Sequence, residues 1–528
     1  MFLVSFYSSD PKDDFEYCKS MFFCKETDEA IASEDKEVFK QIITLETHPS
    51  LLQTTASFLD FKSFLSLSLA SKAVRENLIL MTPPLKINLS RPTGSMGFSK
   101  KLQTLENFKH CYSSVKLNFQ HDLGGFWVSK IVKEFLEKLT SCRALRFEQS
   151  SVLFINNLNF PKRLKTLILE SDRQQIDLES SFKHLGELKC LTKLSLLSTI
   201  HASCIDDLTR FLSTHSLRKF KIGSATLSTL QPKQASKIIL SIKKLQKFSL
   251  VKTEFYETGV RHTLPLEPEV FAAMQKLLMT NKNLFSFSLR KLERVDEKCW
   301  KALKPTIKLD RLTILKLDQN LLSYTFFDYE DFFSKFPNLR VLNLNYNYFT
   351  QYNSLKLFSS IRNMTKLEQI VLGGNEIGDE GASNLIDSLP SSIEQIFLFG
   401  CEIGDLGASK LFEKLCPGEK FSKVWALGMN GNPISNVGAK ALSNCLRTNP
   451  SLSDIGISFT QMDDMGIVDI ASCLRFSTHL RYIFLFREGH KSAALTTNYS
   501  RRELASNLPT NAIACFEVSR SRHIKNQH

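Results

Sequence analysis

The sequence has no run of about 18 uninterrupted apolar residues, the length that a transmembrane helix needs. Its first residues, MFLVSFYSSD, lack the basic start and the long apolar stretch of a secretory signal peptide. The 12 cysteines include no Cys-x-x-Cys pair, so we expect no zinc module and thiols that are reduced and mostly buried. These absences predict a soluble protein of the cytoplasm, with the nucleus left open, and no membrane partner.

Motifs of the common enzyme classes are absent as well. There is no phosphate-binding loop of the G-x-x-x-x-G-K-[ST] type, no H-E-x-x-H and no G-x-S-x-G. The 11 histidines are dispersed, and none has Cys, Asp or Glu around it at metal-ligand spacing. We therefore expect a protein that is not an enzyme, with no catalytic residue, no cofactor and no metal.

Charge is distributed unevenly along the chain. The formal net charge is +14, whereas residues 1–45 form an acidic arm with ten acidic and five basic side chains. A basic body can attract nucleic acid, an anionic membrane or an acidic protein. The sequence has no run of five or more Lys or Arg and no RNA-recognition or zinc-finger signature, so we expect no nucleic-acid partner. One hypothesis for the acidic arm is that it occupies the basic body and inhibits binding.

A six-residue pattern, Leu-x-x-Leu-x-Leu with other apolar residues allowed at the Leu places, recurs through most of the chain. Its 12 clear copies begin at Leu164, Leu191, Leu217, Leu245, Leu284, Leu312, Leu339, Leu367, Ile393, Val424, Leu452 and Leu480. Successive copies start 26–31 residues apart, with one interval of 39, and weaker copies begin at Pro84, Tyr112 and Cys142. Such a period is typical of a solenoid, in which each repeat packs against its neighbours.

Each repeat is predicted to be a strand followed by a helix. The hexad alternates inward Leu with outward residues, as a strand does, and helical spacing follows it. Gly381, Gly407, Gly438 and Gly466 fall where the strand-exit loop enters the helix, and a small residue there permits close packing. Eight residues after each late hexad start stands a side chain that we expect to hydrogen-bond the backbone of neighbouring turns. These side chains belong to Asn320, Asn347, Asn375, Cys401, Asn432 and Thr460.

The units LEQIVLGGNEIGDEGASNLIDSL and IEQIFLFGCEIGDLGASKLFEKL resemble leucine-rich repeats of the ribonuclease-inhibitor type. The resemblance covers residues 84–490, and the repeats before residue 312 keep the pattern less well. It implies an α/β fold, a right-handed leucine-rich-repeat solenoid or horseshoe, with a parallel sheet on the concave face and helices outside. Residues 491–528 are expected to form a C-terminal cap and a basic tail.

The hexad register also names the side chains of the concave face, which occupy its third and fifth places and the place after it. The first half of this face is basic and its last part carries aromatic residues. The predicted target-binding residues are Lys219, Lys221, Lys247, Arg290, Lys316, Phe397, Phe399, Tyr482, Phe484 and Phe486. Exposed aromatic side chains often dominate the binding energy of a protein interface. For Phe484 and Phe486 the alternative is that residues 490–518 cover them as a cap.

The single long interval, between Leu245 and Leu284, exceeds the usual 28 residues by 11. The extra residues are predicted to fall within 256–268. Insertions in repeat arrays map to loops, so both a binding loop and a neutral insertion fit.

Residues 46–82, before the repeats, have the apolar spacing of short helices. This segment resembles an F-box, a motif that docks on a Skp-type adaptor. The matching positions are Pro49, Leu51, Leu52, Phe58, Leu59, Asp60, Leu65, Leu67, Leu69 and Lys72. The segment departs from that family at His48, where Leu is usual, at Ala56, where a larger aliphatic residue is usual, and in lacking a Trp after the Lys. The resemblance implies that the adaptor-binding residues are Pro49, Leu51, Leu52, Phe58, Leu59 and Leu65.

An F-box-like segment followed by a repeat array is similar to the order found in F-box/leucine-rich-repeat proteins. This resemblance implies a substrate-recognition subunit of an SCF-type (Skp–cullin–F-box) ubiquitin ligase. Its partners would be a Skp-type adaptor, a cullin and an unidentified target protein held on the concave face, where the basic side chains favour an acidic target. One alternative is a scaffold without a ubiquitin role, in which residues 46–82 cap the solenoid. Another is a Ran GTPase-activating-like protein, which the basic C-terminus SRSRHIKNQH disfavours.

Overall fold

A computed structural model provides the structure of the chain. It describes residues 85–89, 114–119, 136–137, 139, 142–148, 160–170, 185–200, 202–253, 255–257, 260–262, 265–292, 295–324, 328–458, 460–477, 479–484, 503, 506–507 and 513–515. Contacts divide the chain into two compact units, one of residues 1–85 and 108–114 and the other of residues 86–107 and 115–528. The repeat array lies in the second unit.

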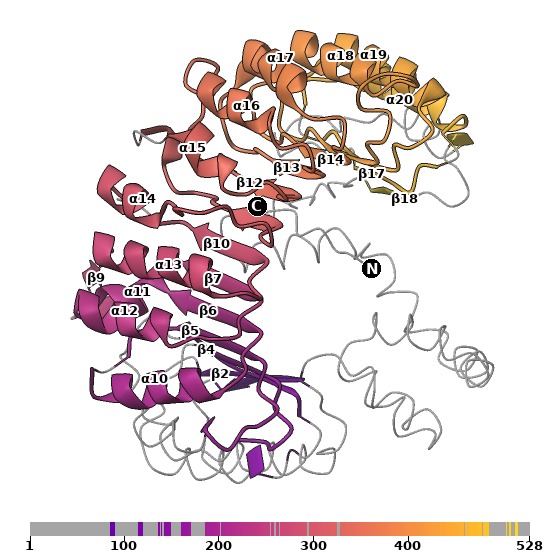
Figure 1. The fold of residues 1–528 in the computed structure, drawn as a ribbon. Coiled ribbons are helices and arrows are strands. Elements are labelled where there is room, and N and C mark those ends of the chain that lie inside the picture. Colours follow the sequence, from indigo (N-terminus) through magenta and orange to yellow (C-terminus); the bar gives the residue numbers. More distant parts are fainter. Residues whose placement is uncertain are drawn as a thin grey trace, which may run out of the picture. The chain divides into compact units, whose positions relative to one another are not determined.

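A 16-stranded sheet runs through the array in nearly sequential strand order (Figure 1). Its strands are β1 Leu85–Leu89, β2 Ser114–Phe119, β3 Ala144–Glu148, β4 Thr166–Glu170, β5 Lys193–Leu197, β6 Lys219–Gly223, β7 Lys247–Val251, β10 Ser286–Arg290, β11 Ile314–Lys316, β12 Val341–Asn343, β13 Gln369–Val371, β14 Gln395–Phe397, β15 Ala426–Gly428, β16 Asp454–Gly456, β17 Tyr482–Phe484 and β18 Ile513–Cys515. Strand pairs such as β6–β7 and β10–β11 are parallel and keep the hexads in register. The weak hexads at Pro84, Tyr112 and Cys142 therefore also form strands, as predicted.

Helices connect successive strands and lie on one side of the sheet (Figure 1). They are α10 Ile205–Thr214, α11 Ser224–Ser228, α12 Pro232–Leu240, α13 Pro268–Thr280, α14 Glu297–Leu303, α15 Tyr329–Ser334, α16 Leu355–Ile361, α17 Gly378–Ser388, α18 Asp405–Lys414, α19 Asn436–Thr448 and α20 Asp464–Leu474, with 3-10 turns η2 Ala202–Cys204 and η3 Leu322–Tyr324. This arrangement is the α/β solenoid that the sequence predicts. The sheet face turned away from the helices is called the open face below.

The core lies between the sheet and the helices. Inward hexad residues such as Leu194 and Leu196 are fully buried. In three adjacent strands the fourth hexad place is aromatic, and the ring centroids of Phe220 and Phe248 lie 6.5 Å apart, those of Phe248 and Phe287 5.4 Å. Side chains at one hexad place therefore stack from repeat to repeat, which gives each unit a core only in the presence of its neighbours.

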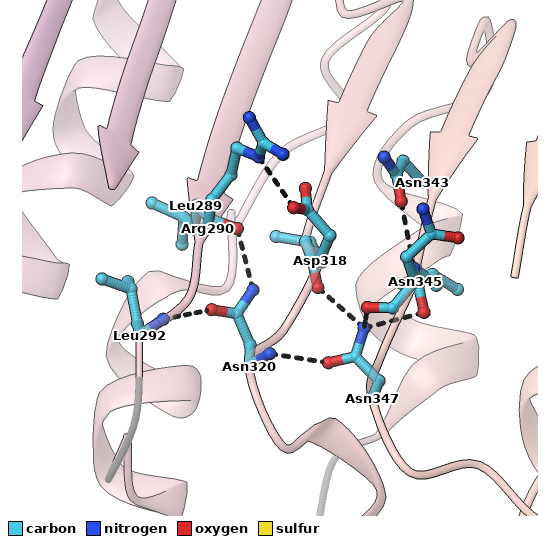
Figure 2. A network of polar contacts seen from close by, with 10 residues as sticks. Leu289, Arg290, Leu292, Asp318, Asn320, Asn343, Asn345 and Asn347 are labelled. Carbon is cyan, nitrogen blue, oxygen red and sulfur yellow. Dashed lines mark hydrogen bonds and ion pairs between the residues drawn. The ribbon is translucent and has the colours of Figure 1, made fainter. Parts of the chain in front are cut away.

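A ladder of buried amides joins the strand-exit turns (Figure 2). Asn320 donates from Nδ2 to the Leu289 carbonyl at 2.8 Å and accepts at Oδ1 from the Leu292 N–H at 3.0 Å. Asn347 accepts in turn from the Asn320 N–H at 2.9 Å and donates to the Leu317 carbonyl at 2.8 Å. The predicted role of these side chains is confirmed, because they satisfy backbone groups that water does not reach.

The same ladder continues through later repeats. Asn375 Oδ1 accepts from the Asn347 N–H at 2.9 Å, and Asn432 Oδ1 accepts from the N–H groups of Cys401 and Ile403, both at 3.0 Å. Cys401 takes the place of an asparagine, and its thiol contacts the Leu372 carbonyl at 3.4 Å. A thiol is a weak donor, so this repeat has a weaker bond at the same position.

The glycines that precede each helix core allow a contact between neighbouring repeats. Asp379 Oδ1 accepts from the N–H groups of Gly404 and Gly407 at 2.7 and 2.9 Å. A Cβ on Gly407 would lie only 2.8 Å from that oxygen. Asp405 repeats the pattern on Gly438, whose N–H it accepts at 2.8 Å. At Gly407 and Gly438 the prediction that a small residue permits close packing is confirmed, and the close contact is an Asp-to-backbone bond between repeats.

Two features of the array differ from simple periodicity. An antiparallel hairpin of β8 Phe255–Glu257 and β9 Val260–His262, separate from the main sheet, overlaps the predicted insertion at residues 256–268. Strand β18 pairs in parallel with β17, although its sequence has no Leu hexad and falls where a C-terminal cap was expected. The acidic arm 1–45 and the F-box-like segment 46–82 lie outside the described residues.

Candidate functional site

Three lysines stand side by side on the open face, one on each of three adjacent strands. The register pairs Lys193 of β5 with Lys219 of β6, and Lys219 with Lys247 of β7. Neighbouring strands are about 4.8 Å apart, so the three side chains leave the sheet close together. Like charges directly opposite one another on a sheet are destabilising. This row of Lys193, Lys219 and Lys247 is called the lysine row.

A second row lies beside it, at the fifth hexad place. Lys221 pairs with Ser195 and Ser249, and Ser288 pairs with Ser249 and Lys316. Small hydroxyl side chains therefore separate the two lysines of this row. They leave room around each ammonium group, which a larger neighbour would fill.

Burial and mutual repulsion both act on these lysines. Burial lowers the pKa of Lys193 below its ordinary value, and the charges of Lys219 and Arg146 lower it further. Burial is also the main cause of the lowered pKa of Lys247, with Lys219 second. The ammonium groups of Lys193 and Lys247 are thus less stable here than in water, and a bound anion would offset this loss.

The second row shows the same effect. Burial lowers the pKa of Lys221, and the nearby charge of Arg290 adds to the shift, while Glu170 opposes it. Burial and Arg290 also lower the pKa of Lys316, against the attraction of Asp318. Attraction from these two carboxylates does not reverse the lowering at either lysine.

Two carboxylates that the structure describes on this part of the open face, those of Glu170 and Asp318, are already paired with arginines. Glu170 Oε2 lies 2.7 Å from Arg146 Nη2, and Asp318 Oδ2 lies 2.7 Å from Arg290 Nε (Figure 2). Within the part of the chain that the structure describes, no carboxylate lies within ion-pair distance of Lys193, Lys219, Lys221, Lys247 or Lys316. Lys247 instead lies over the Phe285 ring, 5.2 Å from its centroid.

The predicted aromatic end of the open face is only partly present. Phe397 lies in register between Val371 and Gly428 but is 1% exposed, so the prediction that it offers an exposed anchor is wrong. Alternation along a strand predicts on which face of the sheet a side chain lies, but it does not predict which residues cover that side chain. Tyr482, in contrast, is 36% exposed.

Phe399 is half-buried because it lies against a glycine of the adjacent repeat and an aromatic ring of the repeat before that one. A Cβ on Gly373 would meet the Phe399 ring at 2.1 Å, and the Tyr346 ring lies 5.9 Å from it between centroids. The phenyl ring therefore packs over the Gly373 backbone. Phe484 belongs to β17, but its side chain and the whole of Phe486 lie outside the described residues, so their roles stay predictions.

The hexad register correctly predicts that the basic residues lie on neighbouring strands of one face, but the predicted set omits two basic residues of that face. Lys219 and Arg290 are exposed, and Lys221, Lys247 and Lys316 are half-buried on neighbouring strands. The predicted target-binding set leaves out Lys193 and Arg146. Both occupy outward hexad places, Lys193 the third place of LTKLSL and Arg146 the fifth place of CRALRF, so the register alone carried the signal.

The predicted adaptor-binding residues form a set that the structure does not test. Pro49, Leu51, Leu52, Phe58, Leu59 and Leu65 all lie outside the described residues. Among the residues that are described, no three His, Cys, Asp or Glu side chains gather as a metal site would require. None of the described helices combines the length and the apolar character needed to cross a membrane.

Comparison with models of protein families supports the repeat assignment. The family model described as "Leucine Rich repeat" matches residues 363–385. This segment is a leucine-rich repeat. Among solved structures, an internalin from Listeria monocytogenes is similar, with 15% sequence identity, a TM-score of 0.35 and coverage of 64% of this chain and 83% of that chain. No curated protein sequence matches the chain.

Leucine-rich repeats constrain function at a general level. Arrays of such repeats present extended surfaces to protein partners, and they are typically binding modules rather than catalysts. The lysine row and the residues beside it are the part of the open face where charge is concentrated.

Proposed function

We propose that this protein is a protein-binding module whose basic open face, on β3 to β11, holds an acidic segment of a target protein. The observation that carries the proposal is the lysine row, in which three ammonium groups share one place on adjacent strands and none lies within ion-pair distance of a carboxylate of the described residues. Lysine side chains that are removed from water are normally paired with a carboxylate. A partner's carboxylates would supply that pairing and relieve the repulsion.

The spacing of the row suits an extended acidic peptide. Two strand spacings separate Lys193 from Lys247, or about 10 Å. Side chains on one face of an extended peptide repeat about every 7 Å, so two or three carboxylates of such a peptide would reach the row and Lys221. Surface ion pairs of this kind are worth about 0.5–1 kcal/mol each. Three of them give about 1.5–3 kcal/mol, or roughly 10- to 100-fold in affinity.

A charge-reversal experiment tests this part of the proposal. A fluorescent peptide of 15 glutamates is the probe, and the variant is Lys193→Glu with Lys219→Glu and Lys247→Glu. A matched control changes three exposed lysines of the helix side, Lys233, Lys243 and Lys276, to Glu. We expect the first variant to lose at least about tenfold in affinity and the control to lose much less. Equal losses would mean that net charge alone drives binding and would overturn the proposal.

We further propose that the chain serves as a substrate-recognition subunit of an SCF-type ubiquitin ligase. The support is the F-box resemblance of residues 46–82, placed directly before a leucine-rich-repeat array. In this role the chain performs no bond chemistry. It holds the target near a ubiquitin-charged enzyme that another subunit supplies, and proximity raises the rate of transfer.

Capture by a purified Skp-type adaptor tests the ligase role. Wild type should bind the adaptor, whereas Leu52→Asp with Leu59→Asp should not, because charged groups would be buried in an apolar contact. Leu240→Asp is the control, since Leu240 is 41% exposed on α12 within the array. Circular dichroism verifies that each variant stays folded. Failure of wild type to bind would overturn the ligase role and leave a repeat scaffold with a helical cap.

A further inference from the structure

One row of exposed apolar side chains follows the edge of the array where the strand-exit loops enter the helices. It occupies the thirteenth residue after the hexad start in successive repeats, from Leu339 to Leu452. The residues are Tyr352, Glu380, Leu406, Val437 and Met465. Four of them are large and apolar, with exposures of 78% for Tyr352, 79% for Leu406, 65% for Val437 and 67% for Met465. We call these five residues the rim row.

The members of the rim row hold equivalent positions. Each of the last four directly precedes a glycine at the start of its helix. Leu406, for example, precedes Gly407, whose N–H donates to Asp379 of the preceding repeat. Leu406, Val437 and Met465 are each the second residue of their helix, in α18, α19 and α20. These helices lie side by side in that order (Figure 1). The row therefore crosses consecutive helices near their N-terminal ends.

The fold does not require apolar residues at these positions. Glu380 occupies the same place in α17, and that helix forms and packs against α18 like the others. A single exposed apolar residue needs no explanation, but repetition at one position in four of five repeats does. Exposed Leu, Val and Met side chains contribute the favourable free energy of apolar burial only when a partner covers them.

The surroundings of the rim row are acidic. The strand-exit segments 374–382, 400–408, 431–439 and 460–467 contain no Lys or Arg, in a chain whose formal net charge is +14. Some of their acids have structural roles, since Asp379, Asp405 and Asp463 accept bonds from backbone N–H groups. Glu376 and Glu402 are exposed and precede the helices, so their charge is available to a partner.

The spacing of the rim row selects the shape of that partner. Packed helices lie about 8–10 Å apart, so successive members of the row are separated by about that distance. An α-helix presents the same face every seven residues, which is about 10.5 Å, whereas an extended strand does so about every 7 Å. A helix laid across α18, α19 and α20 can therefore place one apolar residue at each of Leu406, Val437 and Met465.

We propose that the rim row is a docking surface for a basic amphipathic helix of a partner protein. Its apolar face would cover Leu406, Val437 and Met465, and its Lys or Arg residues would lie against Glu376, Glu402 and Asp463. The surface is separate from the lysine row, because it belongs to other repeats and to the helix edge, and it is opposite in charge. The array can thus bind an acidic target and a basic partner helix at different places.

A designed peptide tests this proposal. The probe is a 21-residue peptide of three heptads, with Leu at the first and fifth places and Lys at the second and sixth of each heptad. A scrambled peptide of the same composition has no apolar face. We expect the amphipathic peptide to bind wild type more tightly than the scrambled one, measured by fluorescence anisotropy, and to gain helical circular dichroism on binding. Equal binding of the two peptides, or binding without helix formation, would contradict the proposal.

The variant Leu406→Glu with Met465→Glu separates apolar contact from charge attraction. It adds two negative charges, so binding driven by charge alone would become tighter, whereas loss of apolar contact should weaken binding at least about tenfold. Glu380 shows that the fold accepts a glutamate at this place. Leu240→Glu with Ile307→Glu is the control, because these residues are 41% and 51% exposed outside the row. Unchanged or tighter binding by the rim variant would overturn the proposal.

Sedimentation velocity examines the other occupant, a second copy of this chain. Wild type should remain a monomer at concentrations where it binds the peptide. A dimer that dissociates in the Leu406→Glu, Met465→Glu variant would assign the rim row to self-association and would refute a partner helix.

Discussion

Replacing Asn347 with Ala should destabilise the array at one identifiable place. The Asn347 side chain is fully buried, donates to the carbonyls of Leu317 and Leu344 at 2.8 and 2.9 Å, and accepts from the Asn320 N–H at 2.9 Å. Alanine can make none of these bonds. Each buried group left without a partner costs about 1–3 kcal/mol, so two or more of them predict a loss of about 2–5 kcal/mol in the free energy of unfolding.

Urea unfolding followed by circular dichroism measures this loss. The control is Asn363→Ala, which changes the same residue type at an exposed position and should stay within about 0.5 kcal/mol of wild type. Because repeat arrays do not always unfold in one step, amide hydrogen exchange provides a local measurement. The Asn320 amide should exchange faster in Asn347→Ala. An Asn347→Ala variant as stable as the control, with the Asn320 amide equally protected, would refute the structural role assigned to the ladder.

Three further predictions follow from the same repeats. Gly407→Ala should destabilise the array by about 1–3 kcal/mol, measured by urea unfolding, because its Cβ would lie 2.8 Å from Asp379 Oδ1; wild-type stability would contradict the close contact. At pH 8 iodoacetamide should label exposed Cys190 and spare Cys401, whose pKa burial raises to about 12, and equal labelling in peptide mass spectra would disprove that burial. Lys221→Met should have a larger free energy of unfolding than wild type at pH 8, and this difference should shrink toward pH 10.5. The reason is that the pKa of Lys221 is lowered in the folded state, so the unfolded wild type binds more protons and wild-type stability rises with pH. A constant difference across that range would contradict the lowered pKa.

Periodicity predicts much of this fold because each repeat meets the same environment. The hexad marks the strands, including weak ones such as β1 and β2, and in the repeats after residue 312 the Asn and Gly positions mark groups with recurring structural roles. Strand β18 is not predicted by the hexad because its sequence, IAC, pairs with β17 through backbone hydrogen bonds, which do not require a leucine pattern. The hairpin of β8 and β9 is not predicted by the period because it lies in an insertion that has no counterpart in the other repeats.

The candidate site is predictable to a different degree. The hexad register alone places Lys219 beside Lys247, since adjacent strands of a parallel sheet start at the same hexad place. Burial on the open face is not predictable in this way. Phe397 occupies an outward place and is nevertheless 1% exposed, because its exposure depends on neighbouring side chains that periodicity does not describe. The rim row has a signal in the sequence, because its members stand at a constant distance from the hexad start.

The central claim is that the lysine row and Lys221 receive the carboxylates of an acidic partner. A carbodiimide reagent joins a lysine amine and a carboxylate only where the two are in contact, so it records that pairing directly. With the 15-glutamate peptide bound, mass spectrometry should find cross-links at Lys193, Lys219, Lys221 and Lys247, and they should weaken as salt screens the charges. Cross-links concentrated at Lys233, Lys243 and Lys276 on the helix side would contradict the account.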